Sequence, residues 1–512
     1  MTLAPSVLFR HPEDRAAAAA AWAPDCLRDL NLDQVFAAIA ADRPDHDLLP
    51  FLHFPLREED DVAWRQEVLR DLEDDALLRD VRVFGAAMSG VRADLARAGK
   101  IRNPRQAERW FLQAAATYVE AAARLNGALS AAAPPSRGLR DVAAHLAALV
   151  ASPGFGALRD EAAAATAALS EIRYGIRIDG LRVDVAPHGG EADFGAEVEE
   201  TFNAFRQGAG KQFGFPFPEQ EELNRVEEMI LEEVVALWPA PFAALSAFRA
   251  RHPDFLDAGV TAFDREIQVY LGWLDHIAPL RALGLAFCYP RVSRSSKETL
   301  ARAGFDVALA SAMARDRRVP VVNDIALAGP ERVIVVSGPN QGGKTTFSRW
   351  FGQMHYLAAL GLTVPGEEAR LFLPDRIFTH FERGEAVVAE RGRLQDDLLR
   401  VHDILAAATP DSVIVMNEIF SSTSWRDATL LSRRLAERIV ALGLLCIWVT
   451  FVEDLATLGP QTVSMVSTLD PADPAARSFR VVRQVPDGRA YALAIAEKHR
   501  LTRAAILERL AP

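Results

Sequence analysis

A glycine-rich stretch at residues 338–346 has the residue types and spacing that hold a polyphosphate. It follows the pattern G-x-x-x-x-G-K-T, with Gly338, Gly343, Lys344 and Thr345 at the fixed positions. Glycines let backbone N–H groups curl around phosphates, the lysine can reach the terminal phosphates, and the threonine hydroxyl can coordinate Mg²⁺. We therefore predict a nucleotide-binding P-loop made of Gly338, Pro339, Asn340, Gln341, Gly342, Gly343, Lys344, Thr345 and Thr346.

The residues on either side of this stretch supply the elements that a phosphate loop needs. The β-branched run 333–337 predicts a buried strand, and Phe347-Ser-Arg-Trp-Phe351 has a helical pattern. A helix that begins at the loop directs its positive N-terminus at the bound anion. The strand, the loop and the helix together predict nucleotide binding more strongly than the bare motif does.

A second apolar run, Val413-Ile-Val-Met416, ends in the polar pair Asn417 and Glu418. P-loop enzymes carry at such a place one acid that helps to hold Mg²⁺ and one that orients the attacking water. We assign Glu418 as the catalytic carboxylate, and Thr345 and Asn417 as the metal-side residues. Asparagine brings no negative charge, so we expect metal affinity or the rate of hydrolysis to be reduced.

Length, charge and cysteine content limit the class of protein. The 512 residues are enough for two to four domains. The net charge of −12 argues against a surface that is basic throughout, although a local basic patch could still bind DNA. Cys26, Cys288 and Cys446 are too far apart in sequence for a zinc site or a disulfide framework. No signal pattern or membrane span is recognisable, so we predict a cytoplasmic protein with no membrane partner.

Changes of periodicity divide the chain into four parts. Residues 1–170 and 221–290 have helical periodicity, whereas residues 175–185 alternate apolar and polar types across Asp179-Gly180, which predicts a β-hairpin. After residue 291, apolar strands alternate with helices. We therefore predict helical regions at 1–170 and 221–290, a hairpin and loop insertion at 171–220, and an α/β P-loop domain at 291–512, whose sheet is covered on both faces.

Several motifs resemble those of the MutS DNA mismatch-repair ATPases. The segment from Gly338 to Thr346 is similar to the family's G-P-N-M-G-G-K-S-T, and Glu418-Ile-Phe-Ser-Ser-Thr-Ser424 is similar to E-I-G-R-G-T-S. Further matches follow the family's order at Phe54-Pro-Leu56 with Arg65-Gln66, and at 273–280, 322–327, 364–365, 375–379, Gly488 and 491–496. The resemblance is strong after residue 320 and weak before it.

The resemblance implies a homodimeric ABC-type ATPase that uses ATP and Mg²⁺ and moves a helical lever. Residues 171–220 would replace the family's DNA clamp at reduced size. Each nucleotide would lie between one subunit's P-loop and its partner's signature loop, which by position is Glu390-Arg-Gly-Arg-Leu-Gln395. Residues from Trp425 to Asp427 would face the dimer partner. Besides Asn417, two positions depart from the family pattern: Leu394 replaces a serine, and Phe451 replaces the histidine that follows Thr450.

The family's mismatch-reading and connector domains have no counterpart in this sequence, which predicts a short form. Phe217-Pro-Glu219 and Phe381-Glu382 are the nearest Phe-x-Glu-like stretches, and both are more typical of loop or packing residues. Basic residues around the hairpin are either a solvated face or contacts to a phosphate backbone: Arg173, Arg177, Arg182 and Lys211.

Two hypotheses for the function remain open. The first is a dimeric ATPase that binds DNA by its structure. The second is a slow or non-hydrolysing nucleotide switch that binds a protein partner, which the three departures at Asn417, Leu394 and Phe451 favour. A metabolic kinase is disfavoured because no small-substrate site is recognisable outside the P-loop. ATP or ADP is the expected ligand in both hypotheses.

Overall fold

The run 333–337, which is rich in β-branched residues, forms an inner strand of a six-stranded sheet, with a neighbouring strand on each side. Its five side chains are all buried. The computed structural model describes residues 4–180, 182–189, 222–381, 392–469, 477–485 and 501–510. In chain order the strands of this sheet are β7 (Val333–Ser337), β10 (Ile377–Phe381), β11 (Val413–Asn417), β12 (Leu445–Val449), β13 (Thr462–Leu469) and β14 (Arg477–Arg483).

The strands lie in the order β10-β11-β12-β7-β13-β14. Neighbouring strands are parallel except β14, which pairs antiparallel with β13. The predicted strand at 413–416 is confirmed as β11, and the apolar residues 445–449 form β12. Because β7 and β11 both pair with β12, the ends of the predicted P-loop strand and of the acid-bearing strand are separated by one strand only.

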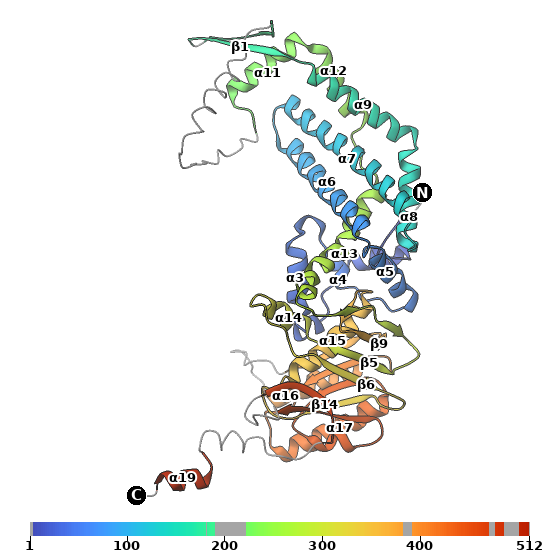
Figure 1. Cartoon of the computed structure of the whole chain (residues 1–512), viewed down its shortest axis with the longest axis vertical. Coiled ribbons are helices and arrows are strands. Elements are labelled where there is room, and N and C mark those ends of the chain that lie inside the picture. The colour runs from blue at the N-terminus through green and yellow to red at the C-terminus, as the bar shows by residue number, and fades with distance from the viewer. Residues whose placement is uncertain are drawn as a thin grey trace. The chain divides into compact units, whose positions relative to one another are not determined.

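Helices cover both faces of this sheet, as the continuous apolar strands predict. Figure 1 shows these helices with the sheet in its yellow-to-red part: α15 (Lys344–Ala359), α16 (Arg393–Ala407) and α17 (Trp425–Leu442). Ile414 and Met416 of β11 pack in one apolar cluster with residues of α16 and α17. Val415, which points to the other face, lies against Gly352 of α15. The coarse prediction of a mixed α/β region that follows a helical one is confirmed.

Shorter elements complete this part of the chain. Two smaller sheets have the strand orders β4-β9-β5-β6 and β3-β8. Their strands are β3 (Phe287–Cys288), β4 (Arg291–Ser293), β5 (Thr299–Gly304), β6 (Asn323–Leu327), β8 (Val364–Pro365) and β9 (Glu368–Phe372). The remaining helical segments here are α14 (Val307–Ala314), the 3₁₀ turn η2 (Glu453–Thr457) and α19 (Arg503–Leu510).

The N-terminal helices pack on α15 and the segment that follows it. They are α1 (Pro12–Ala19), α2 (Cys26–Asp29), α3 (Leu32–Ala41), the 3₁₀ turn η1 (Pro44–His46), α4 (Leu49–Leu52) and α5 (Glu59–Asp71). Arg65 of α5 is 1% exposed and donates hydrogen bonds to Leu8 O (2.9 Å) and Leu360 O (3.0 Å). Tyr356 of α15 donates to Leu52 O at 3.0 Å. These buried bonds tie residues near the N-terminus to the phosphate-loop helix.

The chain divides into two compact units. The first comprises residues 1–73, 135–139 and 265–512, and the second comprises residues 74–134 and 140–264. The elements of the second unit and its boundaries are α6 (Asp75–Lys100), α7 (Pro104–Ala132), α8 (Arg137–Val150), α9 (Pro153–Ser170), β1 (Tyr174–Asp179), β2 (Arg182–Pro187), α11 (Arg225–Leu237), α12 (Pro239–Arg251) and α13 (Ala258–Ala282). The four-part division made from the sequence stays a prediction.

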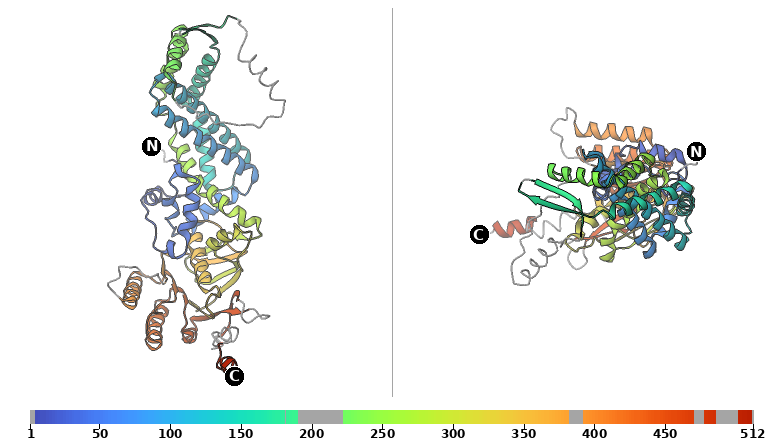
Figure 2. Two further views of the ribbon diagram at one scale, coloured as in Figure 1. Left: turned by 90° about the vertical axis from the view of Figure 1, so that its left-hand side faces the viewer. Right: turned by 90° about the horizontal axis from the view of Figure 1, so that it is seen from above.

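Local capping explains where several helices of the second unit begin. The side chains of Asp74, Asn103 and Asn224 accept hydrogen bonds from the first turns of α6, α7 and α11. The predicted hairpin is confirmed, because β1 and β2 pair antiparallel with Asp179 opposite Arg182 (blue-green arrows in Figure 2). Gly180 lies in its turn with φ +63°, a conformation that favours glycine.

Among the described residues, no single helix is long and apolar enough to cross a membrane. Two strongly bent helix pairs, α8 with α9 and α11 with α12, reach that threshold by length and composition alone.

Candidate functional site

The predicted phosphate loop joins β7 to α15 and is packed tightly against β13. Gly338 has φ +112°, and a Cβ atom there would lie 2.7 Å from Ser467 O. A Cβ on Gly342 would lie 2.2 Å from Ser467 Oγ, which donates a hydrogen bond to Gly342 O at 2.7 Å. Gly343 precedes the first residue of α15 with φ +89°. Both the backbone conformation and the lack of space therefore require glycine in this loop.

Replacing Gly342 by alanine is expected to destabilise the first unit by about 1–3 kcal/mol, because the new methyl group overpacks the contact with Ser467. Removing the obstructing hydroxyl with the second change Ser467→Ala should recover most of that loss. Gly127→Ala is the matched control, since nothing lies within 4 Å of a Cβ built there. Thermal unfolding of the variants measures the effect, and equal stability of the Gly342 and Gly127 variants would contradict the expectation.

The Lys344 side chain folds back over its own loop. Its Nζ donates to Gly338 O (2.9 Å), Pro339 O (3.1 Å) and Asn340 Oδ1 (3.2 Å), and it lies 3.9 Å from Glu418 Oε1. Burial lowers the pKa of the Lys344 ammonium, while the nearby Glu418 carboxylate opposes that shift. Among the described residues, the acceptors within 4 Å of the ammonium group are these loop oxygens and the Glu418 carboxylate, so a phosphate oxygen could take the place of the loop oxygens as acceptor.

Thr345 and Asn417 meet at the ends of their elements. The Thr345 hydroxyl donates to Asn417 Oδ1 at 2.9 Å, and Asn417 is the last, buried residue of β11. Glu418 follows with φ +52°, and its N–H donates to Val449 O at 2.9 Å. The loop after β11 thus places the Glu418 carboxylate, whose side chain is 37% exposed, beside Lys344. The structure brings together the residues that we assigned to catalysis and to the metal.

The start of α15 suits a polyphosphate. The first backbone N–H groups of a helix have no intrahelical acceptor, and Phe347 N is the first here to bond back, to Gly343 O at 2.9 Å. The N–H groups of Lys344, Thr345 and Thr346 therefore remain to be satisfied by an anion or by water. With the glycine cradle and the Lys344 ammonium, these donors fit a nucleotide's phosphates.

The oxygen atoms near the loop suit Mg²⁺ only in part. Thr345 Oγ1 and Asn417 Oδ1 are both uncharged, and Glu418 is the nearby carboxylate that we predicted. Within the described ranges, no group of three or more His, Cys, Asp or Glu residues could hold a metal ion. A cation here would depend on the nucleotide's phosphates for most of its negative partners.

Three residues at the loop were not predicted from the sequence. Ser467 of β13 bonds to Gly342, Arg477 Nε donates to Asn340 O at 3.0 Å, and Phe479 lies 3.7 Å from a Cβ built on Gly343. Arg477 and Phe479 belong to β14, which follows the P-loop by more than 130 residues in sequence. No local pattern marks them, because their place depends on the pairing of β13 with β7 and β14.

The predicted departures from the family pattern occupy different surroundings. Leu394 is partly buried and packs against the apolar cluster beneath α16 and α17. Phe451 is 39% exposed, and its ring lies 5.3 Å from that of Trp425, which is 64% exposed. Asp427 accepts a hydrogen bond from Ser424 Oγ at 2.7 Å, and Ser424, the N-cap residue of α17, accepts one from the Asp427 N–H at 3.2 Å. Residues 390–391, Gly488 and the segment 491–496 lie outside the described residues, as do Lys211, Phe217-Pro-Glu219 and Glu382.

Comparison with known proteins agrees with the position of this loop. A family model described as MutS domain V matches residues 334–508. The endonuclease MutS2 of Thermus thermophilus is 31% identical over 183 residues, which is 35% of this chain and 24% of that protein. The DNA mismatch repair protein MutS of Shouchella clausii is 33% identical over 139 residues, 27% of this chain and 16% of its own length.

A third relative, the DNA mismatch repair protein MutS of Syntrophomonas wolfei, is 31% identical over 152 residues. That match covers 30% of this chain and 17% of the relative. The chain thus aligns with a quarter or less of the length of these relatives. The predicted resemblance to the MutS family is confirmed for the region that contains β7, α15 and β11, because residues 334–508 match the model of MutS domain V and the three relatives are similar to this chain over 139 to 183 residues.

Proposed function

We propose that this chain is a MutS-family ATP-binding protein that acts as a homodimer, hydrolyses ATP slowly and binds DNA by its structure. The observation that supports this proposal most directly is the meeting of three groups at one loop. Lys344 Nζ, the Thr345 hydroxyl and Asn417 Oδ1 lie together at the ends of β7 and β11. The names of the relatives, an endonuclease and two mismatch-repair proteins, make DNA the first partner to test.

In this proposal the residues 338–346 hold the phosphates of ATP, and Lys344 contacts the terminal ones. Thr345 and Asn417 would hold Mg²⁺, whose role is to neutralise charge on the phosphates during transfer to water. Glu418 would accept a hydrogen bond from the attacking water, since its carboxylate already lies 3.9 Å from Lys344 Nζ. Arg477, which donates to the loop at Asn340 O, would add positive charge on the phosphate side.

Slow hydrolysis is expected from three side chains, of which Asn417 contacts the loop at Thr345. Asn417 replaces a charged Mg²⁺ partner with a neutral amide, which weakens metal affinity. Phe451 has no polar hydrogen atom to donate to a phosphate, and its ring packs on Trp425 instead. Leu394 packs into the domain core rather than presenting a hydroxyl group to a second subunit. ATP binding therefore has more support than rapid turnover.

Dimer and DNA contacts would use exposed residues of different units. In the first unit, Trp425 and Arg426 are exposed at the start of α17, where the family places dimer-facing residues. In the second unit, Arg177 and Arg182 are exposed on the ribbon β1–β2. Guanidinium groups on such a ribbon could contact a phosphate backbone without reading bases. Nucleotide-dependent movement of the helices would link the two activities.

Steady-state ATP hydrolysis, with and without DNA, tests the enzymatic part of the proposal. We expect a low Mg²⁺-dependent rate that Glu418→Gln abolishes. Asn417→Asp should raise the rate about tenfold, because a carboxylate at that position strengthens Mg²⁺ binding. It can also still accept the hydrogen bond from the Thr345 hydroxyl group. ATP binding without any turnover would leave a nucleotide switch and reject the ATPase.

Gel-shift measurements test the DNA part separately. Duplex, mismatched duplex and a four-way junction are compared across a salt series, since backbone contacts weaken steeply as salt increases. Preference for the junction would support recognition of DNA structure. Absence of binding to all three at low salt would reject the DNA role while leaving ATP binding intact.

A further inference from the structure

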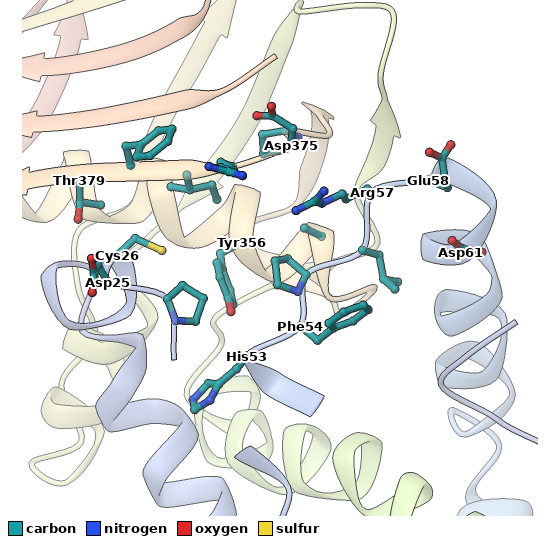
Figure 3. Close-up of a pocket in the computed structure, with 18 of the residues that line it drawn as sticks. Asp25, Cys26, His53, Phe54, Arg57, Glu58, Asp61, Tyr356, Asp375 and Thr379 are labelled. Atoms are coloured by element: carbon teal, nitrogen blue, oxygen red, sulfur yellow. The ribbon is translucent and has the colours of Figure 1, made fainter. Parts of the chain in front are cut away.

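A large cavity lies in the first unit, away from the phosphate loop. Its volume is about 1000 Å³, and its described lining includes none of the residues 338–346. Figure 3 shows Tyr356 in the middle of the lining, with Asp25 and Cys26 towards one end and Glu58 and Asp61 towards the other. A volume of this size suits a drug-sized molecule or a short peptide segment.

The walls of the cavity provide an apolar band between polar ends. Leu56 and Tyr356 are buried, and Phe54, Phe378 and Ile404 are partly exposed. These side chains come from the N-terminal segment, from α15, from β10 and from α16. Tyr356 uses its hydroxyl to donate to Leu52 O, so its ring edge and not its polar group is available to an occupant. An occupant should therefore carry at least one apolar side chain.

Strand β10 brings an open sheet edge to this cavity. It is the outermost strand beside β11, and residues 376–379 line the cavity. Val413 N donates to Arg376 O at 2.9 Å, and Ile377 is registered with Val413. The backbone N–H and C=O groups of the even-numbered residues of β10 therefore form the hydrogen bonds to β11. Those of Ile377 and Thr379 point away from β11, to the outer edge of the sheet.

These outer-edge groups are only partly satisfied. Thr379 O accepts a hydrogen bond from Arg400 Nη2 at 2.9 Å. The N–H and C=O of Ile377 form no hydrogen bond with any other described residue. Free groups on an edge strand are a template for pairing with another extended chain. A peptide that pairs at Ile377 would lie within the cavity, whose lining also includes Pro24 and Asp25.

The charge of the lining favours a basic occupant. It contains seven carboxylates and three guanidinium groups, and one of those three, Arg400, is paired with Asp29 at 2.7 Å. The carboxylates of Glu13, Asp14 and Asp25 form no ion pair with other residues that the structure describes. Arg57 and Arg376 also lack ion pairs there, but the acidic groups outnumber them. The remaining negative charge complements lysine or arginine side chains.

We propose that this cavity binds an extended, basic peptide segment of a partner protein by adding it to the edge of β10. The peptide backbone pairs with Ile377, alternate apolar side chains lie against Phe54 and Tyr356, and the basic side chains of the peptide face the lining carboxylates, which include Glu13, Asp14 and Asp25. Main-chain bonds supply affinity in such strand addition, and pockets for alternate side chains supply specificity. The inference is independent of ATP binding and of the DNA role.

Fluorescence anisotropy with synthetic peptides tests this proposal on the full chain. The probe is a fluorescein-labelled, amidated heptapeptide with alternating valine and arginine. We expect at least tenfold weaker binding when glutamate replaces arginine. Two analogues, each N-methylated at one of two adjacent central residues, provide the sharper test. Only one of two neighbouring amides faces β10, so one analogue should lose binding at least tenfold and the other should keep it.

Variants of the chain locate the bound peptide. Glu13→Gln, Asp14→Asn and Asp25→Asn combined should weaken binding at least tenfold, whereas Asp33→Asn, exposed on α3 and absent from the lining, should leave it unchanged. Ile377→Pro should also weaken binding, because proline removes the outward N–H but leaves the even-numbered ladder to β11. Thermal unfolding verifies that each variant is folded.

Three results would overturn the proposal. They are no detectable binding of the arginine peptide, equal binding of the glutamate peptide, and equal effects of both N-methyl analogues. These three results are all obtained with the unmodified chain, so they can reject the proposal even if a variant fails to fold.

Discussion

Replacing Lys344 by alanine is expected to weaken ATP binding about 100-fold, which corresponds to roughly 3 kcal/mol. The reason is the position of its ammonium group, which lies over the loop within 3.2 Å of three loop oxygens. Hydrogen bonds between a charged group and phosphate each contribute roughly 1.5–3 kcal/mol, and alanine removes all of those made by Nζ. Isothermal titration calorimetry with ATP and Mg²⁺ measures the loss.

Lys100→Ala is the matched control, since Lys100 is an exposed lysine at the end of α6 in the other unit. It should bind ATP like the unmodified chain. The Lys344 variant also frees Gly338 O and Pro339 O, so its thermal unfolding without nucleotide must be measured beside the affinity. An affinity within twofold of the unmodified chain in a folded Lys344 variant would refute the assignment of the loop.

Stability is expected to fall as the pH decreases from about 6.5 to 4, and His355 should account for about 3 kcal/mol of that loss. His355 is fully buried in α15, and this burial lowers its pKa to about 4. The folded protein therefore keeps the imidazole neutral, whereas the unfolded chain takes up a proton below about pH 6.5. Each unit by which the pH falls within this window favours unfolding by about 1.4 kcal/mol. Above the window the imidazole is neutral in both states, so no stability is lost there.

Urea unfolding at several pH values measures this effect, with His355→Asn as the test variant. Asparagine does not titrate and can still donate to Phe351 O, the acceptor of His355 Nδ1 at 2.8 Å. A loss of packing would lower the stability of this variant equally at every pH. The slope of the free energy of unfolding against pH therefore isolates the effect of protonating the histidine. His402→Asn, with a side chain that is 78% exposed, should leave the slope as it is. An unchanged slope for the His355 variant would contradict the prediction.

The local part of the site could be predicted from the sequence because one segment contains it. The glycines, Lys344 and the flanking strand and helix are contiguous, and each has a strong local pattern. The contact of Thr345 with Asn417 spans 72 residues, yet it was also expected. It follows from two buried strands whose polar residues end at the same edge of a parallel sheet.

The remaining neighbours of the loop depend on features that have no local pattern. Ser467 reaches Gly342 because β13 pairs with β7 in a register that places Val466 opposite Ser337. A shift of one residue would turn Ser467 to the opposite face of the sheet, and the sequence of β13 alone does not select between these registers. The cavity beside β10 was not expected for a related reason. It is lined jointly by residues near the N-terminus and by α15 and α16, more than 300 residues later in the chain.

The contact between the glycine loop and Ser467 also affects how related sequences should be compared. Gly338 and Gly342 have no room for a side chain even without a nucleotide, because β13 occupies the space. Natural selection for a stable fold would therefore keep both glycines in descendants that no longer use ATP. Lys344 and Glu418 differ, because the side chains of both contribute mainly to chemistry at the loop. Loss of these two residues among homologues, rather than loss of the glycines, would mark the lineages in which nucleotide use has ended.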